Sequence, residues 1–227
     1  RIEWCDYSIN PVKGLCPVAC PDLQGEEYCY ARRMYKRFKW PEKIRWYPPA
    51  WDLVDTLKVP SRIFVGSTFE LFLDSLPENW MEYNLLTIKK KYPQHTFIFL
   101  TKQPQNLRQW SPFPKNCHVG VSATDYGAYV DACNYLCGVE ASVKFISLEP
   151  LLSWKKKQSF FFKGSGVSWV ILGQRTPISE RTTPKVEWIE EIVEAADRAG
   201  VPVFEKNNLQ SLLNGPLRQE FPKEVKP

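Results

Sequence analysis

The chain has 227 residues, of which 44% are hydrophobic and 24% charged, and its net charge is +5. This length and composition are typical of one soluble globular domain and exclude disordered, collagen-like and low-complexity chains. The apolar runs are far shorter than the roughly 18 to 20 residues of a membrane helix, so we expect no membrane span. The opening residues also lack the charged-then-apolar pattern of a signal peptide.

Short, continuously apolar runs recur along the chain, as is typical of strands buried on both faces of a parallel sheet. The predicted strands cover residues 62–66, 96–101, 118–122, 144–148, 169–173 and 201–204, with 2–4 as the remnant of an earlier strand. Apolar residues at helical spacing predict helices over residues 28–38, 78–91, 125–136 and 186–199. Gly200 lies where the last helix should stop.

This alternation of strands and helices predicts an α/β architecture, and periodicity alone leaves open whether the sheet closes into a barrel. Residues 40–60 and 153–168 are expected to form irregular loops. The polar segment from Asn214 onward is expected to be a surface extension. We therefore expect a single domain over residues 1–213, followed by a tail over 214–227.

The seven cysteines are unevenly placed, and their odd number excludes a fully paired disulfide framework. Cys16 and Cys20 form a C-x3-C pair, and Cys29 follows eight residues later at the start of the first predicted helix. Three thiolates leading into a helix suit an iron–sulfur cluster that keeps one iron free of protein ligands. With Cys5 as a fourth ligand, the set would instead suit structural zinc or a fully ligated cluster. The spacing is also compatible with free thiols, and all these hypotheses indicate a reducing, cytoplasmic setting.

The chain opens with Ile-Glu-Trp-Cys-Asp-Tyr-Ser-Ile-Asn-Pro-Val-Lys-Gly-Leu-Cys at 2–16, and Cys-Tyr-Ala follows at 29–31. These motifs resemble the opening of a phage- and prokaryote-associated family of radical S-adenosylmethionine proteins, whose members read I-E-W-T-D-x-T-x-N-P-x-x-G-C followed by cysteines and C-Y-A. The resemblance continues in order through residues 64–72, 93–102, 120–122, 145–152, 169–173 and 199–204.

Two departures from the family pattern stand out. Residues 22–27 lengthen the usual CxxxCxxC motif by six residues, which a loop absorbs at little entropic cost. After the strand predicted at 169–173, relatives read G-G-E-S-G, whereas this chain reads Gly-Gln-Arg-Thr-Pro at 173–177. The second departure puts in doubt any contact that the family's glutamate makes.

The resemblance implies a single-domain partial (β/α) barrel of the radical S-adenosylmethionine type. It implies a [4Fe–4S] cluster held by Cys16, Cys20 and Cys29, with S-adenosylmethionine chelating the fourth iron. One electron, from a donor such as flavodoxin or ferredoxin, would cleave this cofactor to methionine and a 5′-deoxyadenosyl radical that abstracts a substrate hydrogen. The substrate itself stays open.

Side chains at the ends of the predicted strands are expected to converge on one mouth of the barrel. The predicted cofactor-binding residues are Tyr28, Gly66, Ser67, Lys102, Ser122, Glu149, Gly173 and Gln174. Lys102 and Glu149 are also the candidate catalytic residues, and Lys206 and Asn207 are candidates on the substrate side. Each also has an ordinary structural explanation as a turn residue, a cap or a solvated strand end. Structural roles are expected for His95 and His118, and burial as plain thiols for Cys117, Cys133 and Cys137.

Basic residues alternate with aromatic ones from Arg32 to Trp46. This pattern suits phosphate contacts and base stacking, so a nucleic acid or nucleotide is a candidate substrate. The same pattern also describes a solvated amphipathic helix. Two further hypotheses remain: a non-catalytic zinc-binding module that binds nucleic acid, and a family member that binds the cofactor without turning it over.

Overall fold

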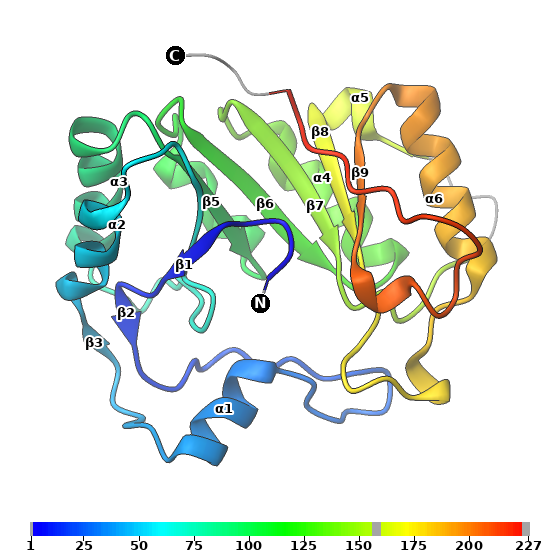
Figure 1. Ribbon diagram of the computed structural model, residues 1–227, viewed down its shortest axis with the longest axis horizontal. Coiled ribbons are helices and arrows are strands. Elements are labelled where there is room, and N and C mark those ends of the chain that lie inside the picture. The colour runs from blue at the N-terminus through cyan, green and yellow to red at the C-terminus, as the bar shows by residue number, and fades with distance from the viewer. Residues whose placement is uncertain (1, 156–159, 224–227) are drawn as a thin grey trace.

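A seven-stranded parallel sheet forms the framework of the computed structural model, which describes residues 2–155 and 160–223. In space its strands run in the order β1-β4-β5-β6-β7-β8-β9. Their bounds are Tyr7–Ile9 (β1), Arg62–Val65 (β4), Thr96–Thr101 (β5), Cys117–Ala123 (β6), Val143–Leu148 (β7), Val167–Leu172 (β8) and Val203–Glu205 (β9). Each strand lies beside its predecessor, so the sheet curls steadily into the open half-barrel seen in Figure 1. The predicted α/β partial-barrel architecture is confirmed at this level.

Helices cover the outer face of the half-barrel (Figure 1). They are α2 (Asp52–Thr56), α3 (Glu78–Lys91), α4 (Tyr126–Cys137), α5 (Phe162–Ser165) and α6 (Val186–Ala199). The predicted bounds of α3 and α6 are confirmed, and α4 begins after Asp125, whose carboxylate accepts a hydrogen bond from the N–H of Ala128 at 3.0 Å. Gly200 ends α6 with a φ of 71°, as expected of a residue in the left-handed region.

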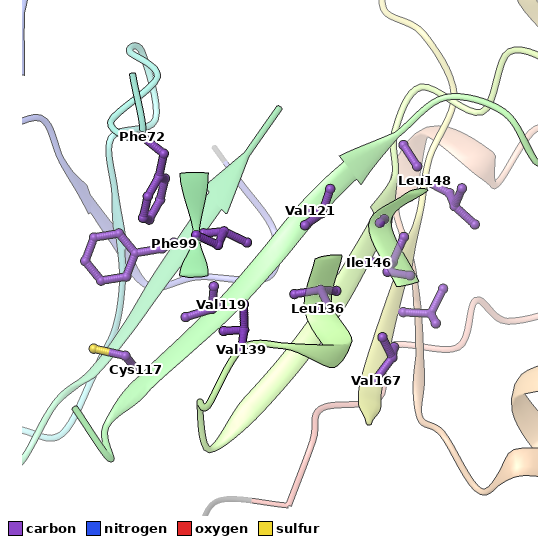
Figure 2. Close-up of a cluster of buried hydrophobic side chains, with 14 of the residues drawn as sticks. Phe72, Phe99, Cys117, Val119, Val121, Leu136, Val139, Ile146, Leu148 and Val167 are labelled. Carbon is purple, nitrogen blue, oxygen red and sulfur yellow. The ribbon is translucent and has the colours of Figure 1, made fainter. Parts of the chain in front are cut away.

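The two faces of the sheet have different cores. Branched aliphatic residues such as Val119, Val121 and Ile146 point outward and pack against the helices, for example against Leu136 of α4 (Figure 2). The inner face carries a buried aromatic cluster, formed by Trp4, Phe64, Phe145, Trp169 and Phe204. This aromatic cluster fills the half-barrel near the beginning of its strands and leaves the other end to polar side chains.

Three predicted segments are corrected by the structure, and one of them is 153–168, which contains α5 and the start of β8 where an irregular loop was expected. Residues 2–4 are not a strand, because Trp4 turns into the aromatic cluster, with its ring centroid 4.8 Å from that of Phe64. The first strand is β1, and Asp6 leads into it by accepting a hydrogen bond from the N–H of Arg62 at 2.8 Å. Residues 40–60 are not simply an irregular loop: they contain β3 (Arg45–Trp46), which pairs with β2 (Val12–Lys13), and α2.

Part of the tail also departs from its prediction. The N–H of Glu220 donates to the carbonyl of Val203 at 3.0 Å, and the ring of Phe221 lies 5.2 Å from that of Phe204. Residues 218–221 therefore pack along β9 rather than extending into solvent. Residues 156–159 of the predicted loop and 224–227 of the tail lie outside the described residues. None of the described helices combines the length and apolarity needed to span a membrane.

Candidate active site

A cavity of about 680 Å³ opens where the parallel strands end. Inward-facing side chains at these ends form one wall, and the cysteine loop with the start of α1 (Tyr30–Phe38) forms the other. The structure brings ten predicted site residues to this cavity: Cys16, Cys20, Tyr28, Cys29, Gly66, Ser67, Lys102, Ser122, Glu149 and Gln174. Lys206 lines it as well. The expected convergence of strand ends on one mouth is thus confirmed.

The six extra residues between Cys20 and Cys29 form a small hairpin. Pro21 and Glu27 pair as an antiparallel bridge, and the N–H of Tyr28 donates to the carbonyl of Cys20 at 3.0 Å. One carboxylate oxygen of Glu27 accepts from the N–H groups of Cys20 (3.0 Å) and Cys29 (3.3 Å). The hairpin therefore closes on itself and returns the second and third cysteines to adjacent positions.

The three loop thiols differ in their electrostatics. A hydrogen bond from the Cys20 thiol lowers the pKa of Cys29 to about 6, and the N–H groups of Arg32 and Ala31 at the start of α1 act in the same direction. The same hydrogen bond raises the pKa of Cys20. Burial raises the pKa of Cys16, although hydrogen bonds from the N–H groups of Glu70 and Val18 act in the opposite direction. Cys29 is thus the thiol that ionises first.

Cys16, Cys20 and Cys29 line the same cavity, but their side chains do not converge on a position where one metal ion could bind all three. Among the residues that the structure describes, no three His, Cys, Asp or Glu side chains gather closely enough to hold one metal ion. Cys5, the contested fourth ligand, does not line the cavity and packs in the aromatic cluster beside Trp4. Cys16, Cys20 and Cys29 therefore form a set of three to which Cys5 does not belong.

Lys102 is a half-buried cation that lines the cavity. Its Nζ lies 3.2 Å from the hydroxyl of Tyr28, and its backbone N–H donates to Glu70 at 2.8 Å. Burial alone would lower the pKa of Lys102, but Tyr28, Cys20 and Glu70 hold it above its usual value. Lys102 therefore stays charged beside the Cys20 sulfur and is not a solvated strand end.

Glu149 and Lys206 form an ion pair across the cavity rim. Both side chains are largely buried, with exposed fractions of 25% and 15%. Gly173 lies directly behind this pair: a Cβ there would come 3.1 Å from Cδ of Lys206 and 3.2 Å from Cγ of Glu149. Gly173 therefore contributes by leaving room for the pair, while Asn207 lies beyond the lining residues.

Gly66 and Ser67 line the cavity and belong to a turn that is stabilised by hydrogen bonds. Gly66 has a φ of 86°, and a Cβ on it would meet the Leu71 side chain at 2.7 Å, so the turn itself requires glycine. The side-chain amide of Asn10 holds this turn by accepting from the N–H of Thr68 at 2.9 Å and donating to the Ser67 hydroxyl at 3.1 Å. The prediction did not include Asn10, although its Asn-Pro motif is part of the family pattern.

The structure also brings Ser147 and Arg175 to the cavity, and neither was among the predicted site residues. Ser147 is the register partner of Ser122, and its buried hydroxyl has no hydrogen-bond partner among the described residues. Side chains alternate between the two faces of a strand, so Ser147 faces inward together with Phe145 and Glu149. The sequence could therefore have predicted Ser147 as a cavity residue. The predicted residue Gln174 is held in place by Asn208, whose side-chain amide donates a hydrogen bond to the backbone carbonyl of Gln174 at 2.8 Å.

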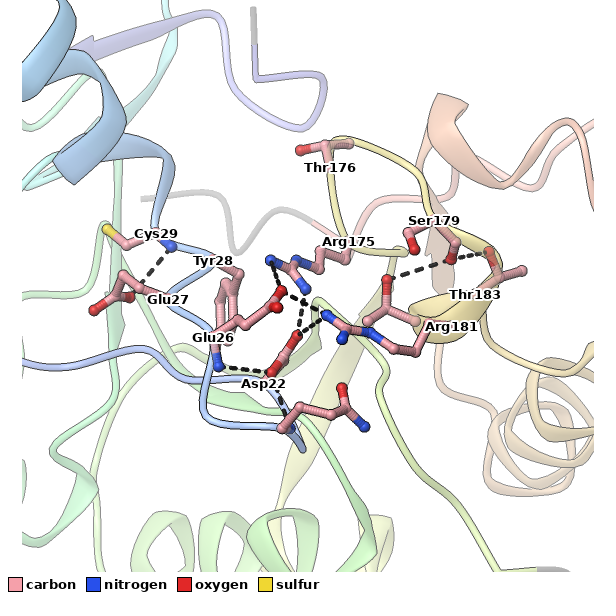
Figure 3. A network of polar contacts seen from close by, with 12 residues as sticks. Asp22, Glu26, Glu27, Tyr28, Cys29, Arg175, Thr176, Ser179, Arg181 and Thr183 are labelled. Carbon is pink, nitrogen blue, oxygen red and sulfur yellow. Dashed lines mark hydrogen bonds and ion pairs between the residues drawn. The ribbon is translucent and has the colours of Figure 1, made fainter.

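An ion network joins the cysteine hairpin to the loop that follows β8 (Figure 3). The buried carboxylate of Asp22 pairs with Arg175 and lies 3.5 Å from Arg181, and Glu26 also pairs with Arg181. Asp22 and Glu26 belong to the hairpin at 22–27 and Arg175 to the Gly-Gln-Arg-Thr-Pro segment at 173–177, whereas Arg181 follows that segment in the chain. The inserted hairpin and the Gly-Gln-Arg-Thr-Pro segment are therefore two halves of one contact beside the cavity, which we call the latch.

The cysteines outside the cavity form no disulfide and lie in varied settings. Cys117 (Figure 2) and Cys133 are buried in the outer core, as predicted. Cys137, which was expected to be buried, is exposed because it is the last residue of α4. His95 accepts a hydrogen bond from the N–H of Ser61 at 3.2 Å, in line with the structural role expected of it.

A comparison with protein-family models gives a match over nearly the whole chain. Residues 1–211 match the model of a family described as Protein of unknown function (DUF5131). The chain belongs to this family. The match covers all the strands of the half-barrel and every residue that lines the cavity, so the cavity is built entirely from DUF5131 sequence. No curated protein matches the chain, and no solved structure does.

Proposed function

We propose that this DUF5131 chain is a radical S-adenosylmethionine enzyme. The observation that carries the proposal is that Cys16, Cys20 and Cys29 line one cavity at the strand ends of a half-barrel, although six extra residues separate the last two. Cys20 and Cys29 are adjacent because the hairpin closes on itself. A fold that returns these thiols to one wall supports a common ligand for all three.

The residues at the cavity suit an iron–sulfur cluster and a charged cofactor. When bound, a [4Fe–4S] cluster with S-adenosylmethionine supplies one-electron reductive cleavage to a 5′-deoxyadenosyl radical. Cys16, Cys20 and Cys29 would hold the cluster, with Cys29 ionised at neutral pH. Lys102 offers a half-buried cation to a carboxylate, and the hydroxyl of Ser147, which has no partner among the described residues, offers a hydrogen bond to a polar ligand.

The remaining cavity residues would orient the cofactor and the substrate. Ser122 and the Glu149–Lys206 pair offer polar groups on the sheet side, opposite the cysteine loop. Tyr28 is held against Lys102 and places its ring beside the thiols. A flavodoxin or ferredoxin is the proposed source of the electron, in the cytoplasm. The hydrogen donor is a substrate whose class is argued in the next subsection.

Anaerobic reconstitution tests the proposal. The chain is incubated with ferrous iron and sulfide, desalted, and treated with dithionite and S-adenosylmethionine. We expect about four iron atoms per chain, brown cluster absorbance and formation of 5′-deoxyadenosine, since three protein thiolates suit a [4Fe–4S] cluster with an open iron. Cys16→Ala, Cys20→Ala and Cys29→Ala should each abolish the absorbance and the product, whereas Cys137→Ala, which removes an exposed thiol outside the cavity, should change neither.

Two other outcomes identify the competing hypotheses. One zinc per chain and no iron after anaerobic purification would indicate the structural zinc module and overturn the proposal. Binding of S-adenosylmethionine to a reconstituted cluster without its cleavage would indicate a chain that has lost turnover. The placement of Cys5 away from the other three thiols favours the cluster over a four-thiolate zinc site.

A further inference from the structure

The positive charge of the chain is concentrated in one segment, residues 30–47, which covers α1 and runs through β3. It contains seven basic residues and one acidic residue, a net charge of +6, whereas the whole chain carries only +5. The remainder of the molecule is therefore close to neutral. In Figure 1 α1 lies below the half-barrel, apart from the helices that cover its outer face, whereas β3 lies beside these helices, with the Trp46 ring stacked on Trp80 of α3.

Five of the seven basic residues of this segment fall into two groups. Arg32 and Arg33 serve the fold: Arg32 donates to the carbonyl of Cys16 at 2.7 Å, and Arg33 donates to the carbonyls of Tyr28 and Thr176 at 2.7 and 2.9 Å. Lys36, Arg37 and Lys43 are exposed and form no ion pair within the described part of the chain. They are charges without a structural partner.

Exposed aromatic rings lie among these charges. The rings of Phe38 and Trp40 are stacked, 5.5 Å apart and inclined by 22°, and have exposed fractions of 52% and 38%. The guanidinium of Arg37 lies 5.3 Å from the Phe38 ring. Large rings exposed next to free cations are costly to leave in water and are the usual means of stacking unpaired bases.

The surface is continuous with the cavity. Arg33, Met34 and Trp40 line the cavity wall, so the exposed face of α1 leads directly into it. A ligand held along the surface would therefore present one of its units at the cavity mouth. An acidic peptide would use the cations but not the stacked rings, and an anionic bilayer would not fit through the mouth.

We propose that Lys36, Arg37, Phe38, Trp40 and Lys43 form a docking surface for single-stranded nucleic acid, with phosphates on the cations and bases on the stacked rings. As a substrate surface it rests on the function proposed above, because the cavity that it leads to is the reaction site of that function. As a binding surface it stands on its own charge and geometry.

Fluorescence anisotropy on the full chain without cluster tests binding directly. The probe is a labelled single-stranded DNA of about 15 nucleotides, with the RNA of the same sequence and the matching duplex as comparisons. We expect tighter binding of the single strands than of the duplex, and affinity that falls as salt rises from about 50 to 200 mM. Lys36→Ala/Arg37→Ala/Lys43→Ala should weaken binding about 10-fold or more and lower the salt slope by about 2.

A matched variant separates this surface from charge in general. Lys58→Ala/Lys89→Ala/Lys90→Ala removes three exposed lysines elsewhere and should leave affinity and slope unchanged. Phe38→Leu, which keeps apolar bulk but removes the ring, should weaken single-strand binding about 10-fold and barely affect the salt slope. Equal losses from both triple variants, preference for the duplex, or no binding to either single strand would overturn the proposal.

The assay also separates the two proposals. Nucleic-acid binding with no 5′-deoxyadenosine from the reconstituted chain would retain the surface and reject the radical chemistry. Formation of 5′-deoxyadenosine in a chain that binds no single strand would reject the surface and retain the chemistry.

Discussion

At the scale of single residues, Gly173 determines how closely Glu149 and Lys206 approach each other. Gly173→Ala would place a methyl group 3.1 Å from Lys206 and 3.2 Å from Glu149, both of which are packed in the rim. We expect a loss of about 1–3 kcal/mol in the free energy of unfolding, as is usual for overpacked sites. Urea denaturation of the apoprotein measures it.

Gly164→Ala provides the control for this prediction. A Cβ at Gly164 meets no atom within 4 Å, and the residue lies in α5, where alanine is the better helix former. This variant should therefore match or slightly exceed the stability of the parent chain. Equal destabilisation by the two substitutions would contradict the view that Gly173 makes room for the ion pair.

At the scale of elements, the latch joins two loops that would otherwise be independent. Arg175→Met removes one of the two arginines that pair with the buried Asp22 carboxylate, while keeping most of the side-chain bulk. We expect the amides of the hairpin to exchange about 10-fold faster or more, with little change in the exchange of the sheet, because the hairpin opens locally. Hydrogen–deuterium exchange followed by mass spectrometry measures both.

The latch should also respond to pH in a defined direction. Burial alone would raise the pKa of Asp22, but hydrogen bonds from the N–H groups of Glu26 and Gln24 and the charges of Arg175 and Arg181 hold it below its usual value. The latch is therefore present above the ordinary carboxyl pKa of about 3.9 and is lost as the pH falls through the lowered value.

Arg198→Met is the control for Arg175→Met. It breaks an exposed ion pair on α6 and should leave hydrogen exchange in the hairpin unchanged. Faster hairpin exchange in Arg198→Met would contradict the role assigned to the latch.

The sequence predicts elements best where one periodic pattern decides them. The bounds of α3, α6 and β5 were predicted to the residue, because their apolar positions repeat over 14, 14 and 6 residues. Prediction from the sequence fails for elements of two to five residues, because their existence depends on the strand or loop against which they pack. Examples are β1, β3 and α2. Local propensity carries little information over such lengths.

At the scale of the whole molecule, strand order explains why so much of the site was predictable. Residues at the ends of parallel strands must meet at one edge, so Lys102, Ser122 and Glu149 followed from the strand assignments alone. The latch did not, because Asp22 and Arg175 are 153 residues apart and only the curl of the sheet brings them together. Ion pairs between loops leave no periodic pattern in the sequence.

Residues 218–221 close the half-barrel at the end opposite the cavity. The Phe221 ring packs on Trp169 and Phe204, and the Arg62 guanidinium lies 3.8 Å from its centroid. Phe221→Ala should lower the free energy of unfolding by about 1–2 kcal/mol, since the ring is 36% exposed and loses apolar and cation–π contacts. Ile178→Ala, at a site that is 56% exposed, is the control, and equal effects in urea denaturation would contradict a closing role for the tail.

The stability of the whole fold should depend on His118. Burial, with the nearby charge of Arg62, lowers the pKa of His118 to about 4, whereas an unfolded histidine titrates near about 6.5. Between these values the unfolded chain binds more protons than the folded chain, so stability falls as the pH decreases from 6.5 towards 4. Going from pH 7.5 to 5, the contribution of His118 amounts to about 2 kcal/mol.

His118→Gln removes this titration and should flatten the corresponding part of the pH dependence, measured by urea denaturation of the apoprotein at both pH values. His95 retains a smaller slope of the same sign, because burial lowers its pKa as well. An unchanged pH dependence in His118→Gln would mean that the imidazole takes up its proton at the same pH in the folded and the unfolded chain, and it would contradict a lowered pKa in the fold. The surroundings of the ring argue against that outcome, because burial and the positive charge of Arg62 both disfavour its protonated form.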